Sequence, residues 1–438
     1  MRLKLMPEVL QVGIAGLGTV GSETYRILTE RSDFLSHRSG KKIEVTAVSA
    51  KNRTAERGID LSNVHWIDDA RDLCRRSDVD VIVELIGGSE GIAREIAELA
   101  LKNGKSLITA NKALIAHHGD AIGKKAEEMN LKLGYEASVA GGIPIIKTLR
   151  EGLASNKFTR VYGILNGTCN YILTTMRETG RDFNDVLEDA QKFGYAEADP
   201  SFDIDGIDAA HKLAILTSIA FQTRINFDSV HTEGIRFIAP IDLELSAELG
   251  FRIKLLGIAE KKFEGIQQRV RPCLVPINSP IAQVEGVFNA VAAEGDGVGL
   301  SLSFGRGAGA GPTASSVIAD ILDLASNRTT PNFGVNDHDL VDGNSIKVDC
   351  LEGSYYLRLK VVDRPGVLAD LTAIFRDKNV SVEAMLQRGR DPEELVPVVL
   401  TTHETSESSI LSSIKEFQKL DSVAESPKIL PIENFTAD

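Results

Sequence analysis

The sequence predicts an α/β protein of three domains: a doubly wound parallel sheet, an α+β domain with an open sheet, and a ferredoxin-like βαββαβ module. Three observations support this prediction. Short apolar runs alternate with helical patterns up to about residue 135, and alternating strands then mix with long helices up to about residue 330. A last block arranges strand and helix patterns in the order βαββαβ. Alternation of the first kind is typical of a parallel sheet with crossover helices.

The elements of the first two domains follow from the period of their apolar residues. In the first domain, strands are expected at 10–15, 44–49, 79–85, 106–109 and 132–135, and helices at 20–31, 91–103 and 119–129. In the second domain, strands are expected at 159–164, 257–262, 267–275 and 299–304, and helices at 144–154, 207–221 and 313–325. The last helix is expected to return to the first domain.

The third block is a self-contained βαββαβ pattern. Its strands are expected at 355–362, 380–388, 395–402 and 428–432, and its helices at 367–378 and 406–420. The expected domain boundaries are 1–136 with a returning helix at about 305–330, 137–330, a polar linker at 331–350, and 351–438.

Composition narrows the classes of function. The chain has 438 residues, 43% of them apolar and 25% charged, and a formal net charge of −13. No basic block offsets this negative charge, so neither a nucleic acid nor a membrane is expected as a partner. Apolar stretches are interrupted well short of a membrane span, and the N-terminal segment is expected to be a first strand rather than a signal peptide. Four scattered cysteines favour a reducing cytoplasm.

A glycine motif joins the first strand to the first helix. Gly16, Gly18 and Gly21 form G-x-G-x-x-G, with Thr19 and Val20 at the helix start. In this context the glycines allow a tight turn, the approach of a pyrophosphate and close helix packing, while free N–H groups face the phosphates. The motif predicts a dinucleotide site of the Rossmann type; a purely structural turn is the alternative.

The end of the second strand bears on the choice of cofactor. An acid there would bind the ribose 2′-hydroxyl of NAD, but the sequence places Lys51 and Arg53 at this point. Two cations suit a 2′-phosphate, so NADP(H) is expected in preference to NAD(H). The alternative is that both side chains are simply solvated.

The segment 194–213, GYAEADPSFDIDGIDAAHKL, holds the densest group of charges. Five carboxylates precede one lysine, Lys212, and Asp208 lies four residues before it on an expected helix. Such a pair shares a helical face, and an isolated pair is usually a solvated ion pair. The additional acids favour a site that binds a cation, and an apolar helix would lower the pKa of the lysine, which suits it to proton transfer.

Three further loops are candidate ligand-binding segments. Lys112 follows a strand end, where open α/β sheets bind ligands, although loop lysines are commonly surface residues. The loop 136–144 offers the carboxylate of Glu136 and free carbonyls, which suit either a hard cation or a tight turn. The segment 166–170, NGTCN, offers backbone donors and hydroxyls, including those of Gly167 and Thr168, at a helix start. Cys169 and His211 are expected to be packing residues.

Taken in order, the motifs GLGTVG, TANK, YEASVAGGIPII, GILNGTCNYI, GYAEADPSFDIDGIDAAHK and GRGAGAGPTAS resemble those of the homoserine dehydrogenase family. The likeness covers about residues 10–330, and it is most specific at 194–212. The tail, with DRPGVLADLTAIF at 363–375, resembles an ACT domain, which is common in the longer members of that family.

The resemblance implies roles for particular residues. Lys212 matches the acid/base lysine, and Lys112 matches a lysine beside the nicotinamide and substrate. The substrate-binding set is Glu197, Asp203, Asp208, Gly167 and Thr168; the cofactor-binding set is Gly16, Gly18, Thr19, Val20, Gly21, Lys51, Arg53, Lys112, Gly309 and Gly311; the sodium loop is Glu136 with Val139, Gly141 and Ile143.

The expected reaction is the reversible conversion of L-homoserine and L-aspartate 4-semialdehyde with NAD(P)(H), in threonine, methionine and isoleucine biosynthesis. Lys212 is assigned the proton and Lys112 a polarising role, although both have the required chemistry. The ACT-like tail implies feedback by an amino acid, with threonine the leading candidate, and a homo-oligomer, either dimer or tetramer. Two alternatives are a same-fold dehydrogenase of another amino-acid-derived aldehyde and a non-catalytic sensor of NADPH and amino acid.

Overall fold

A computed structural model of the chain describes residues 9–347, 351–387 and 395–435. These residues divide into two compact units. Of the described residues, the first consists of 9–161, 211–228 and 289–343, and the second of 162–210, 229–288, 344–347, 351–387 and 395–435. The last residue of the strand expected at 380–388, and residues 348–350 of the expected linker, lie outside the described residues.

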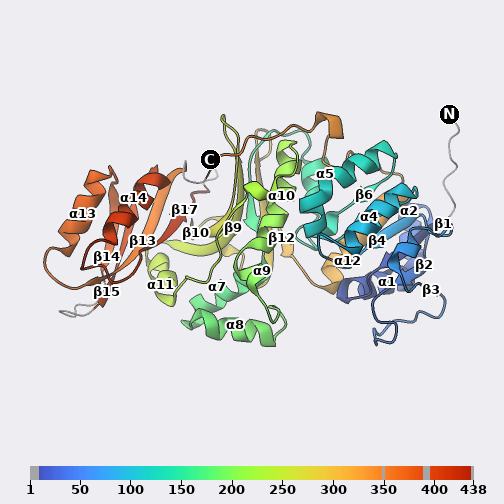
Figure 1. Cartoon of the computed structure of the whole chain (residues 1–438), viewed down its shortest axis with the longest axis horizontal. Coiled ribbons are helices and arrows are strands. Elements are labelled where there is room, and N and C mark those ends of the chain that lie inside the picture. Colours follow the sequence, from blue (N-terminus) through green and yellow to red (C-terminus); the bar gives the residue numbers. More distant parts are fainter. Residues whose placement is uncertain (1–8, 348–350, 388–394, 436–438) are drawn as a thin grey trace. The chain divides into compact units, whose positions relative to one another are not determined.

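The first unit is built on a six-stranded parallel sheet with the order β3-β2-β1-β4-β5-β6 (Figure 1). The order reverses direction at β1, as in a doubly wound fold. Its elements are β1 (Val9–Ala15), α1 (Thr19–Glu30), α2 (Ser32–Ser39), β2 (Lys42–Ser49), β3 (His65–Trp66), α3 (Ala70–Leu73), β4 (Val81–Glu84), α4 (Ile92–Lys102), β5 (Ser106–Thr109), α5 (Lys112–Glu128), β6 (Leu133–Gly134), η1 (Glu136–Ser138), α6 (Ile145–Lys147), η2 (Thr148–Gly152), β11 (Phe288–Gly295), β12 (Gly299–Arg306), α12 (Ala310–Ala325) and η5 (Asp337–Asp339).

Helix α12 brings a late part of the chain back to this sheet. Its buried residues Val317 and Ile321 belong to the same apolar core as Val12 and Ile14 of β1. The helix also packs against α1. Burial of an aliphatic side chain of this size is worth about 1.5–3 kcal/mol, so the returning helix is a principal stabilising contact of the first unit.

Several elements of the first unit differ from the expected ones, including β3 and α3, which the sequence patterns did not predict. Helix α5 begins at Lys112 rather than at 119, because the Asn111 side chain accepts the N–H of Leu114 at 3.1 Å and caps the helix there. Helix α2 and strand β11 were also not predicted from the sequence. The sequence of α2 has little apolar periodicity, and β11 is rich in alanine, which favours helices in isolation.

The second unit contains a mixed sheet whose order in this unit is β7-β9-β10-β17-β13-β15-β14. Strands β9 and β10 form a long antiparallel hairpin, and helices α7, α8 and α11 belong to the same unit. The elements are β7 (Phe158–Ile164), α7 (Gly167–Thr179), α8 (Phe183–Lys192), α9 (Ser201–Ile204), α10 (Ile207–Phe221), η3 (Phe227–Ser229), β8 (His231–Thr232), α11 (Pro240–Glu248), β9 (Phe251–Lys261), β10 (Ile266–Pro276) and η4 (Pro280–Gln283). Three of these, β7, α10 and η3, run across the boundary between the units.

The C-terminal module has the expected ferredoxin-like order. Its elements are β13 (Glu352–Val362), α13 (Val367–Asp377), β14 (Val382–Gln387), β15 (Leu395–Thr402), β16 (Thr405–Ser406), α14 (Glu407–Phe417) and β17 (Lys428–Ile432). The two helices pack on the sheet through a core of their own that includes Leu371, Phe375, Ile410 and Phe417. The predicted fold class is therefore confirmed for all three parts of the chain.

Strand β17 connects the module to the rest of the second unit. It pairs antiparallel with β13, while its end pairs parallel with β10 through Leu274 and Ile432. Just beyond it, the Phe435 ring stacks on that of Tyr162, with ring centroids 3.9 Å apart. One continuous sheet therefore includes strands of the second domain and of the module (Figure 1).

Buried ion pairs reinforce this junction. Both oxygens of Glu407, at the start of α14, accept hydrogen bonds of 2.9 Å from the Arg271 guanidinium on β10. The second nitrogen of that guanidinium lies 3.2 Å from Glu233. On the same strand, Arg269 pairs with Glu433 at 2.7 Å. A buried guanidinium is costly unless it is paired, so these contacts depend on one another.

The segment at 331–343 packs against the first unit. The Tyr135 hydroxyl donates a 2.5 Å hydrogen bond to the carbonyl of Asn332, and the Phe333 ring lies against the Tyr135 ring. Arg224 pairs with Asp337 at 3.0 Å. This part of the expected linker is thus held by specific contacts.

Among the helices that the structure describes, none has both the length and the apolar character needed to cross a bilayer.

We expect Glu407→Gln to lower the thermal unfolding midpoint, because it leaves the buried Arg271 charge with Glu233 as its nearest described carboxylate. The free energy of unfolding should fall by about 3 kcal/mol, as it does when other buried ion pairs lose one partner. Circular dichroism during heating measures it. The matched control is Glu416→Gln on the same helix, where the pair with Lys419 is exposed and worth less than about 1 kcal/mol. Equal effects of the two substitutions would contradict the assigned role of the buried pair.

Candidate functional site

The glycine loop between β1 and α1 has the geometry of a phosphate-binding turn. Gly16 has φ of +103°, and a Cβ added there would lie 2.5 Å from the carbonyl oxygen of Leu85. A Cβ on Gly21 would lie 1.9 Å from the carbonyl oxygen of Gly16, so only glycine permits this packing of helix against strand. Helix α1 starts at Thr19 and Val20 behind Gly18, which provides no side-chain cap, so N–H groups stay available for an anion.

An open hollow of about 480 Å³ lies beside this helix start. It is lined by Leu17, Gly18, Thr19, Ser22, Glu23, Arg26, Ala55, Glu56, Arg57, Gly58, Ile59 and Ala310. The lining combines the glycine loop, the loop after β2 and the start of α12. Gly309 is the residue before α12, and the space around the Cβ positions of Gly18 and Gly311 is open. A dinucleotide would fit this hollow with its phosphates on the uncapped helix start.

The loop after β2 carries a basic group that the sequence reasoning identified only in part. Lys51 and Arg53 are exposed there, as expected for a cofactor-selecting loop, but among the basic residues of this loop Arg57 is the one that lines the hollow. The Arg57 guanidinium lies 5.4 Å from the centre of the Trp66 ring and that of Arg53 lies 5.9 Å from it. The sequence did contain a signal for Arg57. It is a third basic residue, four positions after Arg53, and the single tryptophan of the chain follows it.

Two acids of the acid-rich segment, Asp203 and Asp208, lie at the start of α7. Asn166 caps this helix: its Oδ1 accepts the N–H of Cys169 at 2.8 Å. Its Nδ2 donates to Asp203 and to Asp208, each at 2.8 Å. The sequence reasoning named Asn166 as part of a motif but missed that it joins these two acids. The signal was its position as a capping residue in front of an acid-rich segment.

The other substrate-site candidates lie near this group or on neighbouring elements. Gly167 is the first residue of α7, and the Thr168 hydroxyl donates to the carbonyl of Tyr195 at 2.7 Å and lies 3.5 Å from Asp203. Cys169 is buried and lies against the carbonyl of Asp203, which is consistent with packing. Glu197 is exposed in the loop between α8 and α9.

The two candidate lysines lie on different helices. Lys212 is buried on α10, one helical turn after the buried Asp208. Lys112 is the first residue of α5 and is half-buried. The two helices are also connected by a histidine pair, because Nε2 of His211 lies 3.2 Å from Nε2 of His117 and the His211 ring stacks on Phe227.

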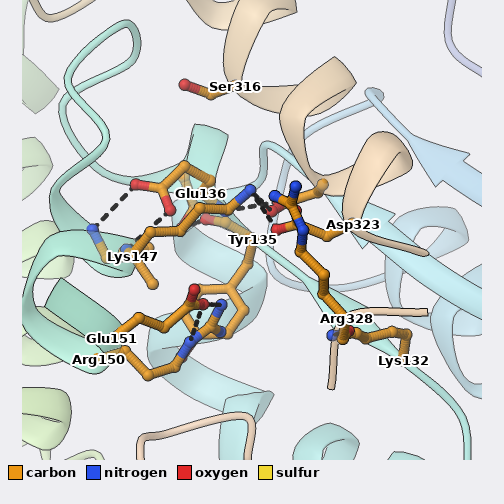
Figure 2. Close-up of polar contacts among 12 residues, drawn as sticks. Lys132, Tyr135, Glu136, Lys147, Arg150, Glu151, Ser316, Asp323 and Arg328 are labelled. Atoms are coloured by element: carbon orange, nitrogen blue, oxygen red, sulfur yellow. Dashed lines mark hydrogen bonds and ion pairs between the residues drawn. The ribbon is translucent and has the colours of Figure 1, made fainter. Parts of the chain in front are cut away.

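Glu136 belongs to a buried charged cluster in the first unit (Figure 2). Its carboxylate accepts the N–H groups of Ile146 and Lys147, each at 2.9 Å. Burial, with the nearby Asp320 carboxylate, raises its pKa to about 7. Burial lowers the pKa of the Lys147 ammonium, but ion pairs with Asp320 at 3.3 Å and Asp323 at 2.6 Å outweigh this and leave it above its ordinary value.

The predicted cation loop passes through this region. Val139 and Ile143 are buried, and the carbonyl of Gly141 accepts the Ser316 hydroxyl at 2.6 Å. Within the described part of the chain, no three His, Cys, Asp or Glu side chains are grouped as metal ligands. A cation at this loop would therefore rely on main-chain carbonyls together with the single carboxylate of Glu136.

Comparison with known proteins places this geometry in a family. Residues 16–136 match the NAD-binding domain of homoserine dehydrogenase, residues 144–322 match the homoserine dehydrogenase domain, and residues 355–421 match the ACT domain. A homoserine dehydrogenase of Pseudomonas aeruginosa is 43% identical over 95% of this chain and 96% of its own length. One of Neisseria gonorrhoeae is 42% identical over 97% of this chain and 99% of its own.

Solved structures agree. A homoserine dehydrogenase from Thiobacillus denitrificans superimposes with a TM-score of 0.92 at 41% identity, covering 98% of this chain and 99% of that one. A hyperthermophilic archaeal homoserine dehydrogenase in complex with NADPH gives a TM-score of 0.63 at 27% identity, covering 74% of this chain and 99% of that one. The chain belongs to the homoserine dehydrogenase family and carries its NAD-binding, catalytic and ACT domains.

Proposed function

We propose that this chain interconverts L-homoserine and L-aspartate 4-semialdehyde in amino-acid biosynthesis, with NADP(H) preferred over NAD(H) and Lys212 as the proton-transfer group. The observation that carries the assignment of residues is the pair of acids on Asn166, of which Asp208 is buried and is followed one helical turn later by the buried Lys212. An amino-acid substrate has both an ammonium, which acids bind, and a reacting oxygen, which needs a proton donor.

Lys212 is assigned the proton because of its surroundings. Its side chain is buried on an apolar helix, where loss of hydration favours the neutral amine and makes proton exchange with a substrate oxygen easier. In the reducing direction, the ammonium stabilises negative charge on the carbonyl oxygen and then donates its proton there. Lys112, at the start of α5, is assigned the role of polarising and positioning the same oxygen.

The acids are assigned to the substrate ammonium. Asp208 and Asp203 provide fixed negative charge, while Glu197 lies in an exposed loop from which it can engage the amino group as the substrate binds. Gly167 and Thr168, at the start of α7, contribute N–H donors, which suit the carboxylate of the substrate. Charge-assisted hydrogen bonds of this kind are stronger than neutral ones and fix the orientation of the substrate.

The cofactor is assigned to the hollow beside α1. Gly16, Gly18, Thr19, Val20 and Gly21 would hold the pyrophosphate, together with Gly309 and Gly311, the neighbours of Ala310 in the lining of the hollow. When bound, the nicotinamide accepts or supplies the hydride. Arg57 and Arg53 beside Trp66, with Lys51 in the same loop, would pair with a 2′-phosphate. The NADPH held by the archaeal relative supports this preference.

The loop with Glu136, Val139, Gly141 and Ile143 is proposed as a sodium site. Its support is the chemistry of the donors: Glu136 provides a buried carboxylate, and the loop with the buried Val139 and Ile143 provides main-chain carbonyls, a set that suits a hard cation.

The ACT domain is proposed to bind threonine as a feedback effector and to pair between subunits of a homo-oligomer, a dimer or a tetramer. The βαββαβ module at 352–432 supports this, because it has its own core and shares a sheet with the second domain.

Lys212→Ala should lower kcat for homoserine oxidation by about 10²–10⁴-fold, the usual worth of a positioned acid–base group. The Kd of NADPH should stay unchanged, because Lys212 does not line the hollow beside α1. Steady-state kinetics and fluorescence titration with NADPH measure the two quantities. Lys192→Ala, at an exposed position on α8, is the control. Retained turnover in Lys212→Ala would assign the proton to another group, with Lys112 first in line.

Arg57→Ala should reduce kcat/KM for NADP⁺ by roughly 10- to 100-fold, since a hydrogen bond to a charged group is worth about 1.5–3 kcal/mol. The value for NAD⁺, which lacks the 2′-phosphate, should change little. Arg75→Ala, at an exposed pair with Asp72, is the matched control. Equal losses with both cofactors would mean that Arg57 supports the loop and does not select the phosphate.

Threonine should inhibit the full-length enzyme, whereas D-threonine and L-serine at equal concentration should have less effect. Initial rates of homoserine oxidation against threonine concentration measure this, and sedimentation in the same buffer gives the oligomeric state. Removing the module is not a suitable comparison, because β17 pairs with β10 as well as with β13. Rates that do not respond to threonine would reject it as the effector.

A further inference from the structure

Asn166 holds a position in the acid site that the roles given above leave unused. It lies between β7 and α7 and is buried. Its Oδ1 accepts the N–H of Cys169, and its Nδ2 donates to Asp203 and Asp208. A carboxamide has one oxygen and two N–H donors, so these three contacts use each of them. The orientation of the amide is fixed chemically, because a flipped amide would direct its oxygen at two carboxylates.

The shared nitrogen brings two negative charges close together. Each carboxylate has an oxygen 2.8 Å from the same atom, so the two oxygens lie within twice that distance of one another. Asp208 is also buried. Two like charges at this separation repel one another, so hydrogen bonds to other groups must fix the positions of the two carboxylates. The amide supplies one N–H to each acid.

The donor is an uncharged amide, so its two hydrogen bonds orient the carboxylates without adding a charge of their own. Capping α7 fixes the amide relative to the backbone, so the two acids are held at defined positions.

We propose that Asn166 is a positioning residue that holds Asp203 and Asp208 in the orientation in which they bind the ammonium group of the amino-acid substrate. This inference rests on the proposed function, and it assigns Asn166 no contact with the substrate.

The test is Asn166→Asp in the full-length enzyme. Aspartate caps helices as well as asparagine does, so the cap is retained while both donors are replaced by a third carboxylate. The KM for homoserine should rise by roughly 10- to 100-fold, which corresponds to the loss of hydrogen bonds to charged groups. This rise should be smaller at lower pH, where the cluster takes up a proton, and the KM for NADP⁺ should not change.

Two further variants isolate the cause. Asn166→Ser keeps a capping hydroxyl and adds no charge, so it should raise the KM for homoserine less and leave its pH dependence as in the wild type. Asn156→Asp makes the same chemical change at a position where Oδ1 accepts the N–H groups of Gly297 and Val298. It should keep wild-type kinetics.

The outcomes are distinguishable. If the wild type turns over homoserine and Asn166→Asp shows an unchanged KM and pH profile, the positioning role is overturned while the proposed function stands. If Asn166→Asp and Asn166→Ser raise the KM for homoserine and for NADP⁺ equally, with equal falls in melting temperature, the role is structural and the inference is overturned. A wild type that does not oxidise homoserine overturns both.

Discussion

The close approach of like charges is the constraint on which the acid site depends. Asp203 and Asp208 each accept a hydrogen bond of 2.8 Å from the same amide nitrogen of Asn166, so the two carboxylates are held close together. The start of α7 in turn fixes the amide, because Asn166 also caps this helix. A helix cap therefore fixes the position of two acids as well as stabilising the helix.

The same cost of unpaired buried charge determines how distant segments join. In the first unit, Lys147 pairs with Asp320 and Asp323 and thereby holds the end of α6 against the returning helix α12 (Figure 2). In the second unit, Arg271 on β10 pairs with Glu407 on α14. In each case the removal of one partner leaves a buried charge. These pairs therefore make the joints between parts of the sequence specific, because a shifted arrangement would not satisfy them.

The features that could be predicted from the sequence are those whose interacting residues lie close together along the chain. The glycine turn, the strands around it and the βαββαβ module were predictable because their signals lie within a few neighbouring residues. The start of α5 at Lys112 was missed because one capping side chain sets it. Arg57 and the bridging role of Asn166 were missed for another reason. Their contacts, with Trp66 and with Asp203 and Asp208, appear only once separate segments have folded together. The spacing of apolar residues along the sequence carries no information about such contacts.

The position of β17 bears on how regulation would operate. An effector bound to the module can alter catalysis only if its binding free energy differs between two states of the rest of the chain. Direct contacts join the module to the rest of the chain and can transmit such a difference. Strand β17 pairs with both β13 and β10, and Glu407 at the start of α14 pairs with Arg271. Arg271 also lies 3.2 Å from Glu233, and the next residue, Gly234, packs directly against Ile204 and Asp205 in the acid-rich segment. Any shift of α14 against β10 must therefore disturb the contacts of Arg271, one of which is with Glu233, the neighbour of the glycine that packs on that segment. The sheet junction thus provides a physical route from the module to the acid-rich segment.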